Sequence, residues 1–218
     1  MSQLVNFQPQ SDAMSRSAYV ISAAASLFLR DGIEAVRMTD IAEAAGIGVA
    51  TLYRHYQTKT ALAIRAGAHI WQRFNERILA LVETDGFIAS CGATRLTMLL
   101  SEYRDAYLDH PDFVRFLDEF DHMVIRESVA PADLSEYGQA IDSFYVIFED
   151  AYQLGIADGS VTRRVDFAVF YRTIAHAMMA IAQKIVRGEI IPSDDFSKGT
   201  DELECIVQMA RFTLGITE

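Results

Sequence analysis

The sequence predicts an all-α protein with a small N-terminal domain and a larger C-terminal domain. From Lys59 onward, apolar residues recur every three or four positions, the period of an α-helix with one buried face, and no segment alternates apolar and polar residues as a half-buried strand would. Clusters of helix-breaking residues separate these stripes at Asp85-Gly86, His110-Pro111, Pro131 and Gly155–Gly159. Because 51% of the 218 residues are hydrophobic, the chain can bury a sizeable core.

A pair of short helices is predicted within residues 39–56. Thr39 can cap the first helix, residues 39–45, and the carboxylates of Asp40 and Glu43 favour the positive end of its dipole. Gly46 can adopt the left-handed conformation that ends a helix sharply. The pattern therefore indicates a helix that stops at a tight turn.

The second helix of the pair is expected from Val49 to Tyr56. Leu52 and Tyr56 lie one turn apart and face inward, whereas short polar, aromatic and basic side chains cover the remaining surface. Such side chains on a helix that fits a major groove can contact base edges and phosphates. Lys59 opens a third helix capped by Thr58, and exposed amides beside a lysine favour phosphate contact. The spacing favours a helix-turn-helix that contacts duplex DNA.

Three amphipathic helices that pack together only for stability are the alternative, since small alanine- and glycine-containing pairs occur in many all-helical enzymes. The helix-turn-helix is favoured because the turn, the TLYRHY helix, Lys59 and Leu62 stand in one uninterrupted register.

From about Ser17 to about Ile70, the chain resembles the N-terminal domain of the TetR family of bacterial transcriptional regulators. The resemblance rests on the block Thr39-x-Ile41-Ala42-x-x-Ala45-Gly46, on Leu52-Tyr53-x-x-Tyr56, on Lys59 with Leu62, and on a first helix with Ala24, Phe28 and Gly32. Two positions depart from the family pattern. Gly48 stands where a serine or threonine usually caps the recognition helix, and Val49-Ala50 stands where a polar residue and a glycine are common.

The pattern and the resemblance together imply a transcriptional regulator, most often a repressor, that binds a double-stranded DNA operator. The residues expected at the DNA are Arg37, Thr39, Gly48, Val49, Thr51, Tyr53, Arg54, His55 and Lys59. The formal net charge of −11 does not contradict this, because residues 1–60 carry five basic and five acidic groups and all the excess acid lies beyond them. DNA affinity should therefore be local and steeply salt-dependent.

Three segments are expected along the chain: a flexible arm at residues 1–15, the DNA-binding domain at 16–62, and a helical ligand-binding and dimerisation domain at 63–218. The larger domain should contain successive helices, whose apolar stripes cover residues 59–81, 96–107, 113–124, 137–151, 164–187 and 203–214.

The last two helices carry more apolar surface than one core can cover. The helix at 164–187 has bulky side chains on one face and small ones on another, and Met209 and Phe212 lie off the inner stripe of the last helix. We predict a homodimer through these two helices, as the resemblance also implies. A larger core within a monomer is the alternative.

The resemblance also implies a small-molecule effector that changes the tilt of the Lys59 helix and releases the protein from DNA. Thirteen Phe and nine Tyr are many for this length, and some of them should surround an apolar or aromatic ligand together with a polar group. A packed, hydrogen-bonded histidine is the alternative for His176. The candidates are Trp71, Phe74, Tyr103, Tyr107, Phe116, Phe120, Phe144, Phe148, Tyr152, Tyr171 and His176.

The competing classes are an enzyme or metal-binding protein, and a helical ligand-binding module whose DNA-reading helix has decayed at Gly48, Val49 and Ala50. Metal binding would use the trio Asp118, Asp121 and His122, which also suits a solvated helix edge. No second ligand cluster, nucleophile motif or phosphate-binding glycine loop accompanies it, so we expect no enzyme activity, catalytic residue, metal or cofactor.

Cys91 and Cys205 form no CxxC pair, and reduced, structural thiols are expected. No apolar run is long enough to span a membrane and no secretory signal is visible, so a cytoplasmic protein is expected.

Overall fold

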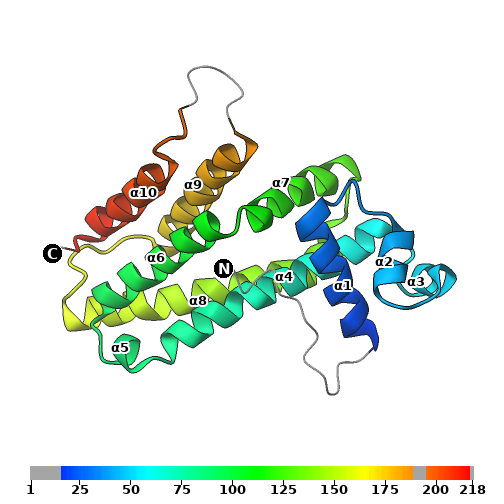
Figure 1. Cartoon of the computed structure of the whole chain (residues 1–218). Coiled ribbons are helices and arrows are strands. Elements are labelled where there is room, and N and C mark those ends of the chain that lie inside the picture. Colours follow the sequence, from blue (N-terminus) through cyan, green and yellow to red (C-terminus); the bar gives the residue numbers. More distant parts are fainter. Residues whose placement is uncertain (1–15, 189–194, 217–218) are drawn as a thin grey trace. The chain divides into compact units, whose positions relative to one another are not determined.

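The computed structural model of the chain describes residues 16–188 and 195–216. Within these ranges it contains ten α-helices, one 3₁₀ helix and no strand, which confirms the all-α prediction (Figure 1). The predicted arm at residues 1–15 lies outside the described residues. In chain order the elements are α1 (Arg16–Asp31), α2 (Met38–Ala44), α3 (Val49–Tyr56), α4 (Lys59–Val82), α5 (Asp85–Ile88), α6 (Gly92–Asp109), α7 (Pro111–Arg126), η1 (Pro131–Leu134), α8 (Ser135–Asp158), α9 (Phe167–Arg187) and α10 (Gly199–Leu214).

The contacts between helices divide the chain into two compact units. Unit 1 contains the chain as far as Phe74 together with Arg115–Ile141, and unit 2 contains Asn75–Val114 and Asp142–Glu218. This division differs from the predicted boundary after residue 62, because α4, α7 and α8 each contribute residues to both units. Most of α7 belongs with the N-terminal helices, although it follows them by more than fifty residues in the sequence.

Unit 1 has a core in which aromatic side chains from α4, α7 and α8 lie close together. Trp71 is fully buried and meets Phe74 edge to face at 5.7 Å between ring centroids. Phe120 stacks on Tyr137 at 4.3 Å, and the Tyr137 ring would be only 2.9 Å from a Cβ atom at residue 67. Gly67 on α4 therefore leaves the space into which this ring packs.

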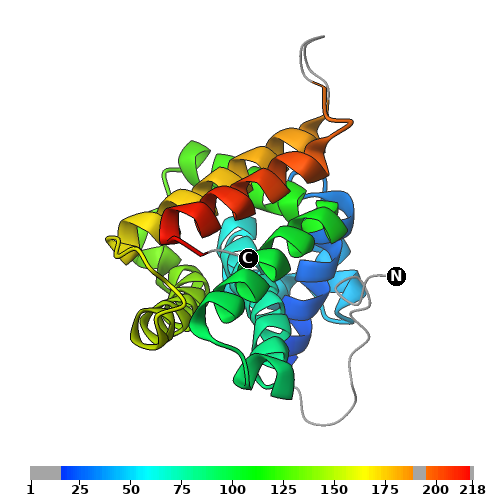
Figure 2. The ribbon, with the colours of Figure 1, turned by 90° about the vertical axis from the view of Figure 1, so that its left-hand side faces the viewer.

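Unit 2 depends on a very close approach between the start of α6 and the end of α8. A Cβ atom at Gly92 would lie 2.0 Å from the backbone nitrogen of Gly155, which is closer than any real contact. Two glycines therefore allow the two backbones to meet. In the same unit, α9 and α10 lie side by side and run in opposite directions (Figure 1 and Figure 2).

Several predicted helix boundaries differ from the observed ones, among them the end of α2, which is Ala44 instead of Ala45. The first helix of the short pair begins at Met38 instead of Thr39, and α9 begins at Phe167 instead of about residue 164. The break expected at Asp85-Gly86 contains the one-turn helix α5, which Thr84 caps by accepting a hydrogen bond from the amide of Phe87. Apolar periodicity cannot detect a helix this short.

Cys91 and Cys205 are free thiols, and both are exposed, so neither packs in a core as the structural interpretation required. No helix in the described part of the chain combines the length and the apolar character needed to cross a membrane.

Candidate functional site

The helices α2 and α3 form the tight pair that the sequence predicts. Gly46 has a φ of 63°, and the amide of Ile47 donates to the carbonyl of Ala42, so the chain reverses directly after α2. Leu52 and Tyr56 are buried, and Ser17 on α1 is hydrogen-bonded to the Tyr56 hydroxyl at 3.1 Å. These contacts fix α3 against α1 from its inner side.

The outer side of α3 carries the aromatic and basic residues of the predicted DNA surface. Tyr53 is 48% exposed, and Arg54 and His55 are also exposed. Among the described residues, the side chains of Arg54 and His55 make no hydrogen bond or ion pair, so both are available to an external partner. Val49 and Thr51 are half-buried on the same short helix.

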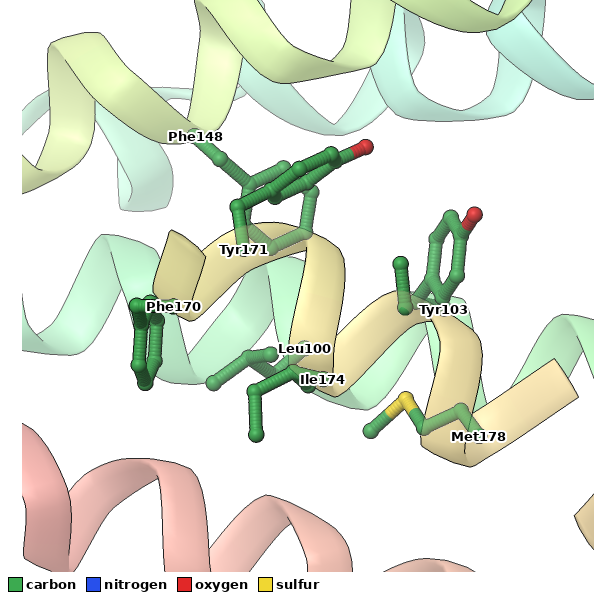
Figure 3. Close-up of a pocket in the computed structure, with 8 residues that line it drawn as sticks. Leu100, Tyr103, Phe148, Phe170, Tyr171, Ile174 and Met178 are labelled. Atoms are coloured by element: carbon green, nitrogen blue, oxygen red, sulfur yellow. The ribbon is translucent and has the colours of Figure 1, made fainter. Parts of the chain in front are cut away.

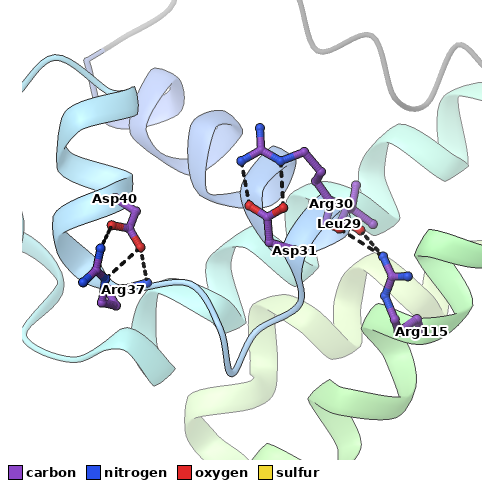
Figure 4. Close-up of polar contacts among 6 residues, drawn as sticks. All are labelled: Leu29, Arg30, Asp31, Arg37, Asp40 and Arg115. Atoms are coloured by element: carbon purple, nitrogen blue, oxygen red, sulfur yellow. Dashed lines mark hydrogen bonds and ion pairs between the residues drawn. The ribbon is translucent and has the colours of Figure 1, made fainter.

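The start of α2 is capped differently from the prediction. Arg37, not Thr39, is the N-cap residue, and Asp40 Oδ2 accepts from the Arg37 amide at 2.9 Å while Thr39 stays exposed. The Arg37 guanidinium also pairs with Asp40 at 2.9 Å, and hydrogen bonds from Arg37 lower the pKa of Asp40 (Figure 4). The positive charge of Arg37 is therefore already balanced by a neighbouring carboxylate.

Gly48 is the N-cap residue of α3 and supplies no side-chain hydrogen bond to it. Thr58 caps α4, as predicted, by accepting from the amide of Ala61 at 3.0 Å. The Lys59 ammonium does not extend outward, as a direct contact with a DNA phosphate would require. It donates to the backbone carbonyls of Ile33, Glu34 and Val36 at 2.8, 3.1 and 3.1 Å. Lys59 thus holds the segment between α1 and α2, and its contact with DNA stays a prediction.

A second candidate site is a small cavity inside unit 2, with a volume of about 10 Å³. Of the eleven predicted ligand residues, Tyr103, Phe148 and Tyr171 line it. The hydroxyl groups of the two tyrosines point to the same side (Figure 3). The Phe148 and Tyr171 rings lie 5.3 Å apart and those of Tyr103 and Phe148 lie 6.3 Å apart. Burial raises the pKa of both tyrosines, so both phenols are protonated.

The other predicted ligand residues do not line this cavity. The ring centroids of Phe144 and Tyr107 lie 5.9 and 5.2 Å from that of Tyr103, and Tyr152 stacks on Phe167 with 4.6 Å between centroids. His176 is exposed on α9, so it is not the polar group of the cavity, because the cavity-facing side of that helix is the one with Ile174 and Met178. Four of the predicted residues belong to the core of unit 1, namely Trp71, Phe74, Phe116 and Phe120.

The cavity also contains residues that the sequence analysis did not select. Its remaining walls are aliphatic or lie on α9 beside Tyr171, and they are Leu100, Phe170, Ile174, Ala175 and Met178. The signal that could have found Ile174, Ala175 and Met178 is their spacing of three, four and seven residues from Tyr171, which places them on one side of α9.

In the trio of Asp118, Asp121 and His122 on α7, His122 makes a local contact with Asp118. The Nδ1 atom of His122 lies 2.7 Å from the carbonyl oxygen of Asp118 and 3.6 Å from its carboxylate. Among the residues that the structure describes, no group of three or more His, Cys, Asp or Glu side chains is arranged to hold a metal ion.

Comparison with known proteins places this helix pair in a family. Residues 20–66 match the family model described as bacterial regulatory proteins, tetR family. The HTH-type transcriptional repressor KstR2 of Rhodococcus jostii (strain RHA1) is 25% identical over 161 residues, which cover 72% of this chain and 73% of that protein.

Solved structures share the fold of this chain over nearly its whole length. A TetR transcription regulator from Haloarcula marismortui ATCC 43049 matches with a TM-score of 0.67 and 22% identity, covering 92% of this chain and 96% of that one. FadR from Bacillus subtilis in complex with stearoyl-CoA matches with a TM-score of 0.63 and 14% identity, covering 90% and 98%. The helix pair and the family model lead to one conclusion: residues 20–66 form a domain of the TetR family of bacterial regulatory proteins, in a chain whose whole fold resembles that of the solved structures.

Proposed function

We propose that the chain is a homodimeric transcriptional repressor that binds operator DNA through α3 and leaves it when a small, uncharged effector binds in unit 2. The observation that carries the DNA-binding part is the outer surface of α3, where Tyr53, Arg54 and His55 are exposed on a helix whose inner side is fixed by Leu52 and Tyr56. A short helix held in this way can enter a major groove and place its side chains at bases and phosphates.

The DNA-binding part can be tested by fluorescence anisotropy with the DNA fragment upstream of the chain's own gene. Tyr53→Ala and Arg54→Ala should each weaken binding about tenfold or more, because each removes a group from the recognition surface. The matched control is Arg164→Ala, which removes an exposed positive charge outside the helix-turn-helix and should leave the affinity unchanged. Equal affinities for all four proteins would show that α3 is not the DNA-reading surface.

The sign of regulation has its own test. The relative KstR2 bears the name of a transcriptional repressor, and a dimer that covers a promoter blocks polymerase without further contacts. In vitro transcription from the upstream fragment should therefore fall as the protein is added. A rise in transcript would make the chain an activator.

The α9 and α10 helices support the homodimer. They expose Val169, Met209 and Phe212 at 59%, 55% and 70%, although each is a large apolar side chain. A groove beside them is lined by residues of both helices and of the segment before α9, including Val165, Val169 and Thr213. A second copy that presents the same two helices would cover this surface by two-fold symmetry. Two recognition helices could then read half-sites about 34–36 Å apart.

A charge in the middle of this surface should break the dimer. Phe212→Asp should give a monomer in light scattering, because it replaces a large apolar ring by a carboxylate whose burial costs free energy even beside the guanidinium of Arg163. Ile125→Asp is the matched control, since Ile125 is 78% exposed on α7 and lies outside the proposed interface. A Phe212→Asp protein with the mass of a dimer would place the interface elsewhere.

The cavity supports an apolar effector with one uncharged polar group. Its walls are aromatic and aliphatic, and none of its lining residues is charged. The Tyr171 hydroxyl is buried, has no hydrogen-bond partner among the described residues and points away from Leu100 and Ile174 (Figure 3). When the rings move apart to admit a ligand, it can donate to an oxygen of that ligand. FadR from Bacillus subtilis, whose fold this chain shares, was solved in complex with stearoyl-CoA.

The effector can be tested with the matched probes 4-ethylphenol and ethylbenzene. The phenol should release the protein from its DNA at lower concentration, because only the phenol can pair with the Tyr171 hydroxyl. Tyr171→Phe should remove this preference while the dimer still binds DNA. If the variant keeps the preference, the polar group of the effector is read at another residue.

A further inference from the structure

The segment between α1 and α2, residues 32–37, is held by polar side chains from two other helices of unit 1. We call it the connector. Lys59 on α4 donates hydrogen bonds to three carbonyl groups of the connector, as described above. From the other side, Glu119 on α7 accepts a hydrogen bond from the amide of Ile33 at 2.5 Å, and its carboxylate would lie 2.7 Å from a Cβ atom at Gly32. Gly32 has a φ of 88°, a conformation that favours glycine, and a side chain there would also displace this carboxylate.

Two further side chains of α7, on either side of Glu119 in the sequence, bind the residues that flank Ile33. Arg115 Nη2 donates to the carbonyl of Leu29 at 2.7 Å and to that of Arg30 at 3.3 Å, at the C-terminal end of α1 (Figure 4). Arg126 forms an ion pair with the carboxylate of Glu34. The guanidinium of Arg115 thereby binds carbonyl groups that have no hydrogen-bond donor within α1, because the helix ends there. It also lies at the negative end of the α1 dipole.

These three α7 residues are spaced by four and seven positions, which places them on one face of the helix. Along this face their charges alternate as positive, negative and positive. Their partners alternate in the opposite sense, as carbonyl oxygens, an N–H group and a carboxylate. The order of the partners along the chain is the same as the order of Arg115, Glu119 and Arg126 on α7.

Alternation of this kind permits a single register. If α7 slid by one turn, about 5.4 Å, Glu119 would face the carbonyls at the end of α1, or Arg115 would face the Ile33 amide. Each of these arrangements opposes groups of like sign and leaves a donor or an acceptor without its partner. The contact therefore favours the observed position of α7 over positions shifted along its axis by one helical turn.

We propose that Arg115, Glu119 and Arg126 are positioning residues that lock the helix-turn-helix in one register on α7 and thereby set the separation of the two DNA half-sites. This proposal rests on the proposed DNA-binding function. None of the three residues needs to touch DNA, because their action passes through the connector to α2 and α3.

The first test measures the contact without DNA, by hydrogen exchange of the Ile33 amide in the full-length protein. Glu119→Ala should speed this exchange about tenfold, because the amide loses its acceptor. Glu119→Gln keeps an acceptor oxygen and should restore most of the protection. Asp121→Ala is the control, since it removes an exposed carboxylate from another face of α7. An unchanged exchange rate in Glu119→Ala would overturn the lock.

The second test measures half-site separation. After the half-sites have been located by footprinting, affinities are compared for duplexes with one base pair inserted or removed between them. The parent and Asp121→Ala should lose affinity sharply with either change, whereas Glu119→Ala should bind the native duplex about tenfold more weakly and respond less to spacing. Exchanging the ion pair, as Arg126→Glu with Glu34→Arg, should restore the spacing response that Arg126→Glu loses.

The outcomes separate the lock from the function on which it rests. Faster exchange in Glu119→Ala together with the parent's spacing response would refute the role of the lock in half-site separation. A parent that binds no fragment would refute the proposed function, and the exchange experiment would still show whether Glu119 holds the connector.

Discussion

The Nη1 atom of Arg77 on α4 lies 2.7 Å from Nε2 of His110, an imidazole that is only 2% exposed between α6 and α7. A guanidinium can only donate, so Nε2 accepts and the imidazole is neutral. Burial, and then the positive charge of Arg77, lower the pKa of His110, while the nearby carboxylates of Asp112, Asp109 and Glu102 act less strongly in the opposite direction. The pair predicts how stability changes in mild acid.

In the unfolded chain, His110 takes up a proton as the pH falls through its ordinary pKa of about 6.5, whereas in the folded protein it does so only at lower pH. The unfolded state then binds more protons, so the free energy of unfolding should decrease as the pH falls below about 6.5. Urea denaturation between about pH 7 and pH 5 measures this slope. His110→Asn should flatten it, and an equal slope in both proteins would contradict the assignment.

Replacing Lys59 by methionine should destabilise the protein by about 1–3 kcal/mol, because the carbonyls of Ile33, Glu34 and Val36 lose their shared donor. Chemical denaturation measures the loss. Arg54→Ala should leave the free energy of unfolding unchanged, since that side chain has no partner in the described structure. If Lys59→Met is as stable as the parent, the ammonium does not support the connector.

Asp40→Asn should strengthen DNA binding, because it releases the Arg37 guanidinium from its ion pair and removes a negative charge beside α3. The asparagine oxygen can still cap α2, so the helix should keep its start. A plot of log affinity against log salt should steepen by about one, the effect of one additional phosphate contact. Unchanged affinity and slope would mean that Arg37 does not reach the backbone of the duplex.

Gly92→Ala should destabilise unit 2 by about 3 kcal/mol or more, because its new methyl group would collide with the backbone of Gly155 at the crossing of α6 and α8. Gly138→Ala provides a matched control on α8, where no atom lies within 4 Å of an added Cβ. This second change should stabilise the protein by up to about 1 kcal/mol through helix propensity. Thermal melting compares both variants with the parent, and a stable Gly92→Ala protein would mean that the two helices can separate.

The sequence allowed the helix pair to be predicted because the pair is built from neighbours in the chain. The Gly46 turn, the range of α3 and the burial of Leu52 and Tyr56 follow from spacing within fewer than twenty residues. The cap of α2 was placed wrongly because a carboxylate two residues inside the helix, that of Asp40, reaches back to Arg37, and spacing alone gives Thr39 the same role.

Neither the cavity nor the contacts between α7 and the connector could be predicted in this way. Tyr103, Phe148 and Tyr171 come from three helices whose relative rotation no local pattern determines, so the equally aromatic Trp71 and Phe120 were equally good candidates. Glu119 meets Ile33 across 86 positions of sequence, and in the sequence it is one acidic residue among many on an exposed-looking helix.

The tight fit of the aromatic rings around the cavity has a kinetic consequence. The cavity has a volume of about 10 Å³, far below the roughly 300–1,000 Å³ of sites that hold drug-sized molecules. A bulky inducer can enter only those molecules whose rings have swung apart, and its apparent affinity is reduced by the rarity of that state. At saturating inducer, the speed of the response would then be set by how often the protein opens, and not by how often the two molecules collide.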